Sequence, residues 1–192
     1  MRTVFPTRDV AKVWATQSQF TGKNPQGNLF FRDSVIYNYG DHFPIAKFVK
    51  NEAGETAVRF NADKYSVTTA KHIGLVVGAL APGLKSGAIK GLFLTHNVEA
   101  QNHTMQQNFY AEEIGEKMRK ADRARKYRDS HLERAVLIMR EALAYSAFYD
   151  LDWGTDDLAR EITADQFETL LDRLDNTRTP LAAGETRRVE HA

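Results

Sequence analysis

The chain has 192 residues, which is enough for one hydrophobic core or for a compact domain with added helices. It contains no cysteine, which excludes a disulfide framework, a thiolate metal site and a cysteine nucleophile. Its composition (42% hydrophobic, 27% charged) is that of an ordinary globular protein. Neither a membrane span nor a signal peptide is expected, and the lack of cysteine fits a reducing compartment, so we predict a cytoplasmic protein.

The net charge of +1 hides a strong asymmetry along the chain. Residues Lys117 to Arg128 carry seven basic side chains and one acid, Asp122, whereas residues Asp150 to Asp175 carry nine acids and two bases. The two segments can complement each other within one molecule or across a dimer. Alternatively, the basic segment binds an external polyanion.

The N-terminal half predicts a short helix and a small sheet. Thr7 to Thr16 has apolar residues at helical spacing, and Thr21 to Asn28 has the Gly, Pro and Asn content of a loop. Alternating and β-branched residues then predict three to four antiparallel strands: Leu29–Phe31, Val35–Tyr39, Phe43–Lys50 and Thr56–Asn61.

The remainder of the chain predicts helices. One starts near Thr68, runs to about Leu80 and is ended by Pro82 and Gly83. A helical hairpin is expected over 97–128 and 130–149, and a capping box at Thr163 starts a last helix that runs to Leu174. The fold class is therefore α+β, with an α+β domain at 1–95, a helical region at 96–177 and a mobile tail at 178–192.

The clearest candidate site is the start of the Thr68 helix. Unpaired N–H groups and a partial positive charge attract anions to a helix N-terminus. The residues predicted to bind a phosphate or another ligand there are Tyr39, Ser66, Thr68, Thr69 and Lys71. His42 and His72 are candidates for an acid–base pair. In the alternative interpretation, Ser66 and Thr68 only cap the helix and both histidines are structural.

Two further segments carry candidate side chains. On a continuous helix His96, Glu99 and His103 would share one face, but two turns separate the histidines by about 10 Å, so neither a metal site nor a cofactor is predicted. The basic segment is typical of helices that neutralise phosphates without recognising sequence. Its predicted nucleic-acid-binding residues are Lys117, Arg119, Lys120, Arg123, Arg125, Lys126 and Arg128.

Two motifs resemble those of a group of small, uncharacterised bacteriophage and prophage proteins. The first is a Y-x-Y-G-x-H-F-P turn, here Tyr37, Tyr39, Gly40, His42, Phe43 and Pro44. The second is a Y-S-x-T-T-x-(K/R)-H helix start, here Tyr65, Ser66, Thr68, Thr69, Lys71 and His72. The resemblance covers about a quarter of the chain. It implies a viral or mobile-element protein in the cytoplasm of an infected bacterium, without implying a mechanism.

Three functions follow from these features. The first is a non-catalytic, phage-type accessory protein that binds nucleic acid, or a partner that processes nucleic acid, through the basic helix and the phosphate-accepting helix N-terminus. The second is a protein-binding or structural oligomeric module that modulates a host factor. The third is an enzyme on a phosphate-containing substrate that uses His42 and His72.

Overall fold

The computed structural model describes residues 2–62, 67–153 and 155–178; the side chains of 67, 68, 155–157 and 176–178 are not described. The chain divides into two compact units, one formed by Met1–Phe109 with Glu141–Trp153 and the other by Tyr110–Arg140 with Gly154–Ala192. The expected domain borders at 95 and 177 stay predictions. None of the described helices combines the length and the hydropathy that a membrane span requires.

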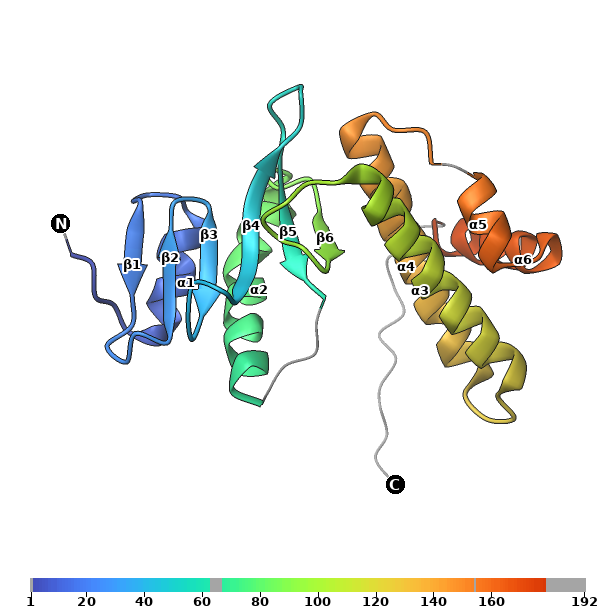
Figure 1. Ribbon diagram of the computed structural model, residues 1–192, viewed down its shortest axis with the longest axis horizontal. Helices are drawn as coiled ribbons and strands as arrows, with labels where there is room; N and C mark the ends of the chain where they lie inside the picture. Colours follow the sequence, from blue (N-terminus) through green and yellow to red (C-terminus); the bar gives the residue numbers. More distant parts are fainter. Residues whose placement is uncertain (1, 63–66, 154, 179–192) are drawn as a thin grey trace, which may run out of the picture. The chain divides into compact units, whose positions relative to one another are not determined.

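The first unit is built on a sheet of six described strands in the order β1-β2-β3-β4-β5-β6 (Figure 1). They are β1 (Thr21–Lys23), β2 (Leu29–Arg32), β3 (Val35–Asn38), β4 (Pro44–Lys50), β5 (Thr56–Asn61) and β6 (Leu92–Thr95). The four predicted strands are confirmed, and each of their ends lies within one residue of the predicted position. The predicted strand number is too low, because β1 lies in the expected loop and β6 lies after Gly83, in a segment for which no element was predicted.

The sheet is also mixed rather than purely antiparallel. Strands β1 to β5 pair antiparallel with their neighbours, but β6 pairs parallel to β5, with Val58 opposite Leu92 and Asn61 opposite Thr95. A parallel pair needs a crossover connection, and helix α2 (Val67–Ser86) supplies it. The start of α2 therefore lies in the connection that leaves β5.

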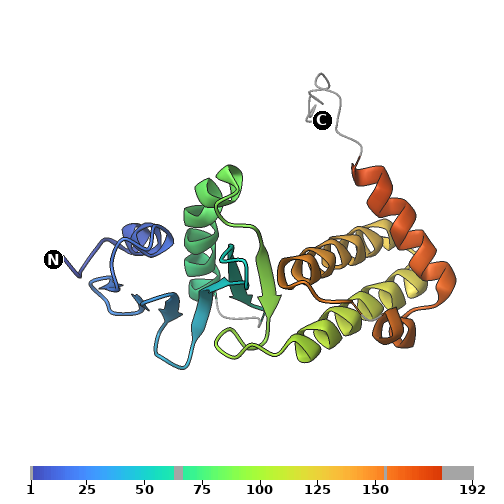
Figure 2. The ribbon, with the colours of Figure 1, turned by 90° about the horizontal axis from the view of Figure 1, so that it is seen from above.

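Helices α1 (Thr7–Ala15) and α2 cover the same face of this sheet, as Figure 2 shows from above. The hydrophobic core between them and the strands includes Trp14 from α1, Phe31 and Ile36 from the sheet, and Val76 and Leu80 from α2, all 0–1% exposed. At roughly 1.5–3 kcal/mol for each fully buried large apolar side chain, this layer fixes α2 against the sheet. The end of β3 is thereby held against the first turns of α2.

Helix α2 continues beyond Pro82, so the predicted stop there is wrong. Proline lacks the N–H that would donate to the carbonyl of the residue four positions earlier, here Gly78, and its ring crowds that carbonyl, so Pro82 weakens the helix without ending it. The helix ends one turn later. Gly87 adopts φ +76°, which only glycine adopts without strain, and its N–H donates to Leu84 O at 3.1 Å.

Helices α3 (His103–Arg123) and α4 (Arg128–Tyr149) confirm the two predicted helices, although α3 is shorter than the predicted range and α4 begins two residues earlier than predicted. Residues 97–102 are not helical, because two asparagines bond to the local backbone instead. The Asn97 Oδ1 atom accepts from the N–H groups of Glu99 and Ala100, and the Asn102 Oδ1 atom accepts from Met105 N and caps α3.

The second unit contains most of α3 and α4 together with α5 (Thr155–Glu161) and α6 (Ala164–Arg178). Its buried side chains include Ile114, Met118, Leu132, Met139 and Leu170. The predicted capping box is confirmed: Gln166 N donates to Thr163 Oγ1 at 3.3 Å, and Thr163 N donates to Gln166 Oε1 at 2.9 Å. Helix α5 was not expected from the sequence.

Candidate functional site

A buried polar cluster joins the end of β3 to the first turns of α2. The Asn38 Nδ2 group donates to Thr69 Oγ1 at 2.8 Å, and the Asn38 Oδ1 atom lies 2.6 Å from His72 Nδ1. These side chains are 2%, 6% and 6% exposed, so the strand contributes a fully buried amide to a helix that is otherwise packed through apolar residues. Asn38, which was not among the predicted site residues, therefore joins two residues that were, Thr69 and His72.

The same bonds favour one tautomer of His72. With the amide nitrogen of Asn38 donating to Thr69, the amide oxygen faces the imidazole, and this arrangement assigns the proton of neutral His72 to Nδ1. Burial lowers the pKa of His72, so the neutral form is favoured. No described residue bonds to Nε2, which leaves a lone pair of fixed direction that can accept a proton or a hydrogen bond.

Tyr39 follows this cluster with a strained backbone. Its φ is +61°, a conformation that bulky residues rarely adopt, and its N–H donates to Asn28 O at 2.9 Å. The ring is 55% exposed, and its centroid lies 6.4 Å from that of the His72 ring. The strained residue thus places an exposed aromatic ring beside the buried histidine.

The other predicted residues of this site do not join the cluster. The His42 ring packs on Phe43, with centroids 4.4 Å apart, and none of the described contacts joins it to His72. Lys71 is exposed. Tyr65, Ser66 and the side chain of Thr68 lie outside the described residues. The acid–base pair and the phosphate site at this helix start both stay predictions.

The residues considered as metal ligands lie on different elements. Only His103 belongs to α3, and its Nδ1 atom bonds to the Tyr145 hydroxyl at 2.8 Å. Glu99 accepts a hydrogen bond from the Tyr37 hydroxyl at 3.0 Å; burial, then this bond, raises the pKa of Tyr37 to about 12. Among the described residues, no three His, Cys, Asp or Glu side chains are placed to hold a metal ion.

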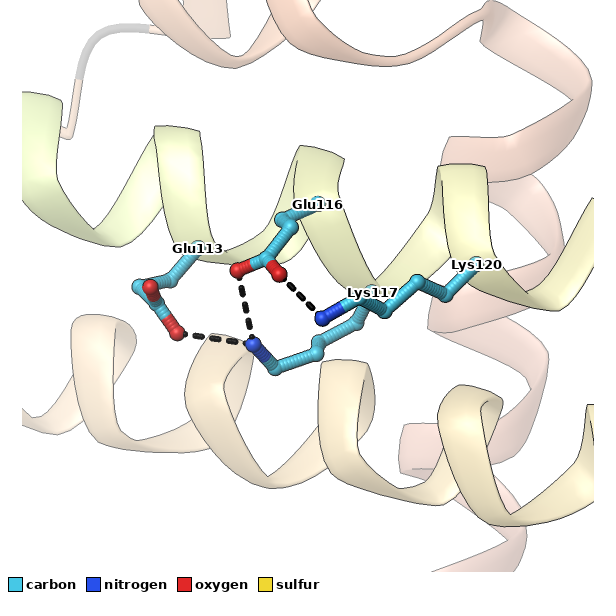
Figure 3. A network of polar contacts seen from close by, with 4 residues as sticks. All are labelled: Glu113, Glu116, Lys117 and Lys120. Carbon is cyan, nitrogen blue, oxygen red and sulfur yellow. Dashed lines mark hydrogen bonds and ion pairs between the residues drawn. The ribbon is translucent and has the colours of Figure 1, made fainter.

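Part of the basic segment is neutralised by acids of its own helix. Lys117 Nζ lies 3.0 Å from both Glu113 Oε2 and Glu116 Oε2, and Lys120 also pairs with Glu116 (Figure 3). The hydrogen bonds from the two lysines lower the pKa of Glu116 to about 2. Arg119 pairs at 2.9 Å with Glu161 of α5. Three of the seven predicted nucleic-acid-binding side chains are therefore engaged within the second unit.

The other four stand at the turn between α3 and α4. Arg123, Arg125, Lys126 and Arg128 are all exposed, and none of them forms an ion pair with a described residue. Between them lies Tyr127, 68% exposed at φ +70°, with Lys126 Nζ 5.3 Å from its ring centroid. We call residues 123–128 the basic turn. It concentrates like charges and holds Tyr127 at a positive φ, both of which oppose folding.

Among the described residues, the acidic segment bonds to α3 and α4 at three points, and none of these lies in the basic turn. Glu161 binds Arg119, Arg173 binds Asp129 at 3.0 Å, and the Gln166 Nε2 group donates to Asp122 at 2.6 Å. Internal charge complementation, the alternative considered for the basic segment, is therefore partial. In the described chain it reaches one of the seven basic side chains.

The chain matches no protein-family model, and no curated protein or solved structure matches it.

Proposed function

We propose that this protein is a non-catalytic accessory protein, of bacteriophage or prophage type, that binds nucleic acid in the cytoplasm of an infected bacterium. The observation that carries the proposal is the basic turn. Four exposed cations without an ion pair in the described structure suit a polyphosphate, and a neighbouring exposed ring suits base stacking. Affinity, not sequence recognition, is the expected contribution of such a surface.

The basic turn is a better candidate for phosphate contact than the start of α2. Thr69 is buried and already accepts a hydrogen bond from Asn38, whereas the cations of the basic turn are open to solvent. Lys117, Arg119 and Lys120 are less suitable, because a phosphate would have to displace Glu113, Glu116 or Glu161 from them.

The test is fluorescence anisotropy with labelled single-stranded DNA, duplex DNA and RNA at about 50 mM salt. The variant Arg123→Gln/Arg125→Gln/Lys126→Gln, called the turn variant, should weaken binding at least tenfold, on the order of 0.5 kcal/mol or more per lost contact. The matched control is Lys23→Gln/Lys50→Gln/Lys85→Gln. Its three exposed lysines lie in the first unit, and it lowers the net charge equally, from +1 to −2.

Equal binding by wild type and turn variant, or an equal loss in both variants, would refute the proposed surface. In the first case the basic turn takes no part. In the second the effect comes from net charge. If wild type binds none of the three nucleic acids, the protein-binding or oligomeric module becomes the better description.

A second candidate function is acid–base chemistry at His72 on a phosphate-containing substrate. It is favoured by the hydrogen bond from His72 Nδ1 to Asn38, which fixes the tautomer and directs the Nε2 lone pair away from that bond. Incubating the same labelled probes with protein tests it by cleavage. Cleavage that is lost in His72→Gln and kept in His42→Gln would identify His72 as the base; uncleaved probes over pH 5 to 9 would exclude this substrate class.

A further inference from the structure

Two acids lie beside the cations of the basic turn. Asp122 is in the last turn of α3, directly before Arg123, and Asp129 is in the first turn of α4, directly after Arg128. Acids this close in sequence can pair with the neighbouring cations and cancel their charge. In the described part of the chain neither acid does so, and each is bonded to α6 instead.

A nearby stretch of α3 shows the outcome when acids have no partner on another helix. Glu113 and Glu116 bond, among the described residues, only to Lys117 and Lys120. Both lysines are thereby neutralised within α3. Helix α6 provides the second pair of acids with other partners, and the cations beside those acids keep their charge.

One side of α6 reaches both acids. The Gln166 Nε2 group donates to Asp122 Oδ2 at 2.6 Å, and Arg173 Nη2 lies 3.0 Å from Asp129 Oδ1. Gln166 and Arg173 are seven residues apart, about two helical turns, so both lie on the same side of α6. Leu170 lies between them and is 0% exposed, which fixes this side of the helix inside the second unit.

The two α6 side chains hold their acids differently. The Gln166 amide is fixed at both ends, because its Oε1 atom accepts from Thr163 N in the capping box while its Nε2 group donates to Asp122. Arg173 brings a positive charge to Asp129, in a pair whose side chains are 37% and 80% exposed. An exposed pair adds little to stability, so Arg173 can be replaced without unfolding the second unit.

We propose that Gln166 and Arg173 are positioning residues for the basic turn. They bind Asp122 and Asp129, so that neither acid neutralises the four cations and all four stay available to nucleic acid. This role rests on the proposed function and gives α6 a part in it. Without Arg173, Asp129 is free to pair with a cation of the basic turn, and about one phosphate contact is lost.

Anisotropy with duplex DNA at about 50 mM salt and above tests this role with the variant Arg173→Gln. Binding should weaken about threefold to tenfold, and the slope of log K against log salt concentration should fall in magnitude by about 0.9, the value for one phosphate contact. Adding Asp129→Asn to Arg173→Gln removes the freed carboxylate. The double variant should therefore recover the wild-type affinity and slope.

The matched control adds Glu168→Gln to Arg173→Gln instead. Glu168 is exposed and lies two residues after Gln166, about 200° around the helix and so on the opposite side of α6. Both double variants return the net charge from 0 to the wild-type +1. Only Asp129→Asn removes the carboxylate that Arg173 holds, so binding should stay weak in the Glu168 control.

Wild-type binding by Arg173→Gln, or equal recovery with Glu168→Gln and with Asp129→Asn, would overturn the proposal. In the second case only net charge matters. The turn variant distinguishes this failure from failure of the proposed function. If the turn variant loses binding while Arg173→Gln keeps it, only the role of α6 is refuted. If neither variant changes binding, the basic turn is not the nucleic-acid surface and the role of α6 is refuted with it.

Discussion

At the residue scale, the bond between Asn38 and His72 determines which imidazole nitrogen carries the proton. Replacing Asn38 by Ala should cost about 2–4 kcal/mol of unfolding free energy, because Thr69 and His72 both lose a buried partner. Denaturant unfolding of Asn38→Ala measures this. Asn28→Ala is not a suitable control, because the Asn28 side chain bonds to Asn24. The control is Asn108→Ala at an exposed position, which should change the free energy of unfolding by less than about 0.5 kcal/mol.

The lowered pKa of His72 gives stability a pH dependence of defined sign. Below pH 6.5 the unfolded chain binds a proton at this residue more readily than the folded chain does, so the free energy of unfolding should fall as pH falls through 6.5 toward the lower folded pKa. Well above pH 6.5 both states are neutral and the effect vanishes. The slope per proton is at most about 1.4 kcal/mol per pH unit.

Denaturant unfolding between pH 8 and pH 5 measures this slope, and His72→Gln should reduce it. His103 adds a slope of the same sign, since burial and then the charge of Arg59 lower the pKa of His103. The slope of His72→Gln should therefore lie between that of wild type and zero. A slope as steep as that of wild type would show that His72 does not titrate as described.

The sequence predicted only part of the Asn38 cluster. Ser and Thr before an apolar helical run are a local signal for a helix start, and this signal located Thr69 and His72. Asn38 has no such signal, because a polar residue at the end of a strand has the same local pattern whether it faces solvent or a helix. Lys71 and His72 are adjacent in sequence, yet one is exposed and the other buried. Only packing of α2 on the sheet distinguishes them.

At the element scale, Gly87 and not Pro82 ends α2. Because Gly87 has φ +76°, Gly87→Ala should destabilise the protein by about 1 kcal/mol. Gly74 is the matched control: it lies on the exposed side of the same helix, where a Cβ would meet nothing within 4 Å, so Gly74→Ala should stabilise by about 0.5–1 kcal/mol. Thermal melts of the two variants should shift in opposite directions. Shifts of the same sign would contradict this assignment of the helix end.

Tyr127 offers a test of base stacking that does not change charge. Tyr127→Asn removes the ring while keeping a residue that tolerates φ +70°. We expect single-stranded DNA and RNA to lose about 1–3 kcal/mol of binding energy and duplex DNA to lose less, because only unpaired bases expose a face for stacking. Anisotropy with the three probes measures this. Equal losses on all three would assign Tyr127 a structural role.

Element prediction succeeded where the signal is local and failed where pairing supplies the structure. The Thr163 capping box and the two predicted strands that form β4 and β5 have short-range signatures, and both are confirmed. Strand β6 has four residues and gains its structure from parallel pairing with β5, which is distant in sequence. Residues 97–102 have helix-compatible composition, but the side chains of Asn97 and Asn102 compete for the backbone N–H groups.

At the scale of the whole molecule, the charge asymmetry visible in the sequence has two parts. Lys117, Arg119 and Lys120 balance acids inside the second unit, whereas the basic turn retains its charge. Counting charges along the chain cannot separate these groups, since both lie within twelve consecutive residues. A self-associating module would use the same exposed charges, and would be recognised by sedimentation that changes between about 50 and 200 mM salt.

The most direct test of nucleic-acid binding at the basic turn is the salt dependence of the duplex-DNA association constant. Each phosphate contact contributes about −0.9 to the slope of log K against log salt concentration. The turn variant should therefore show a slope smaller in magnitude by about 2–3 than that of wild type, while the Lys23/Lys50/Lys85 variant should keep the wild-type slope. Equal slopes for wild type and turn variant would contradict the proposed surface.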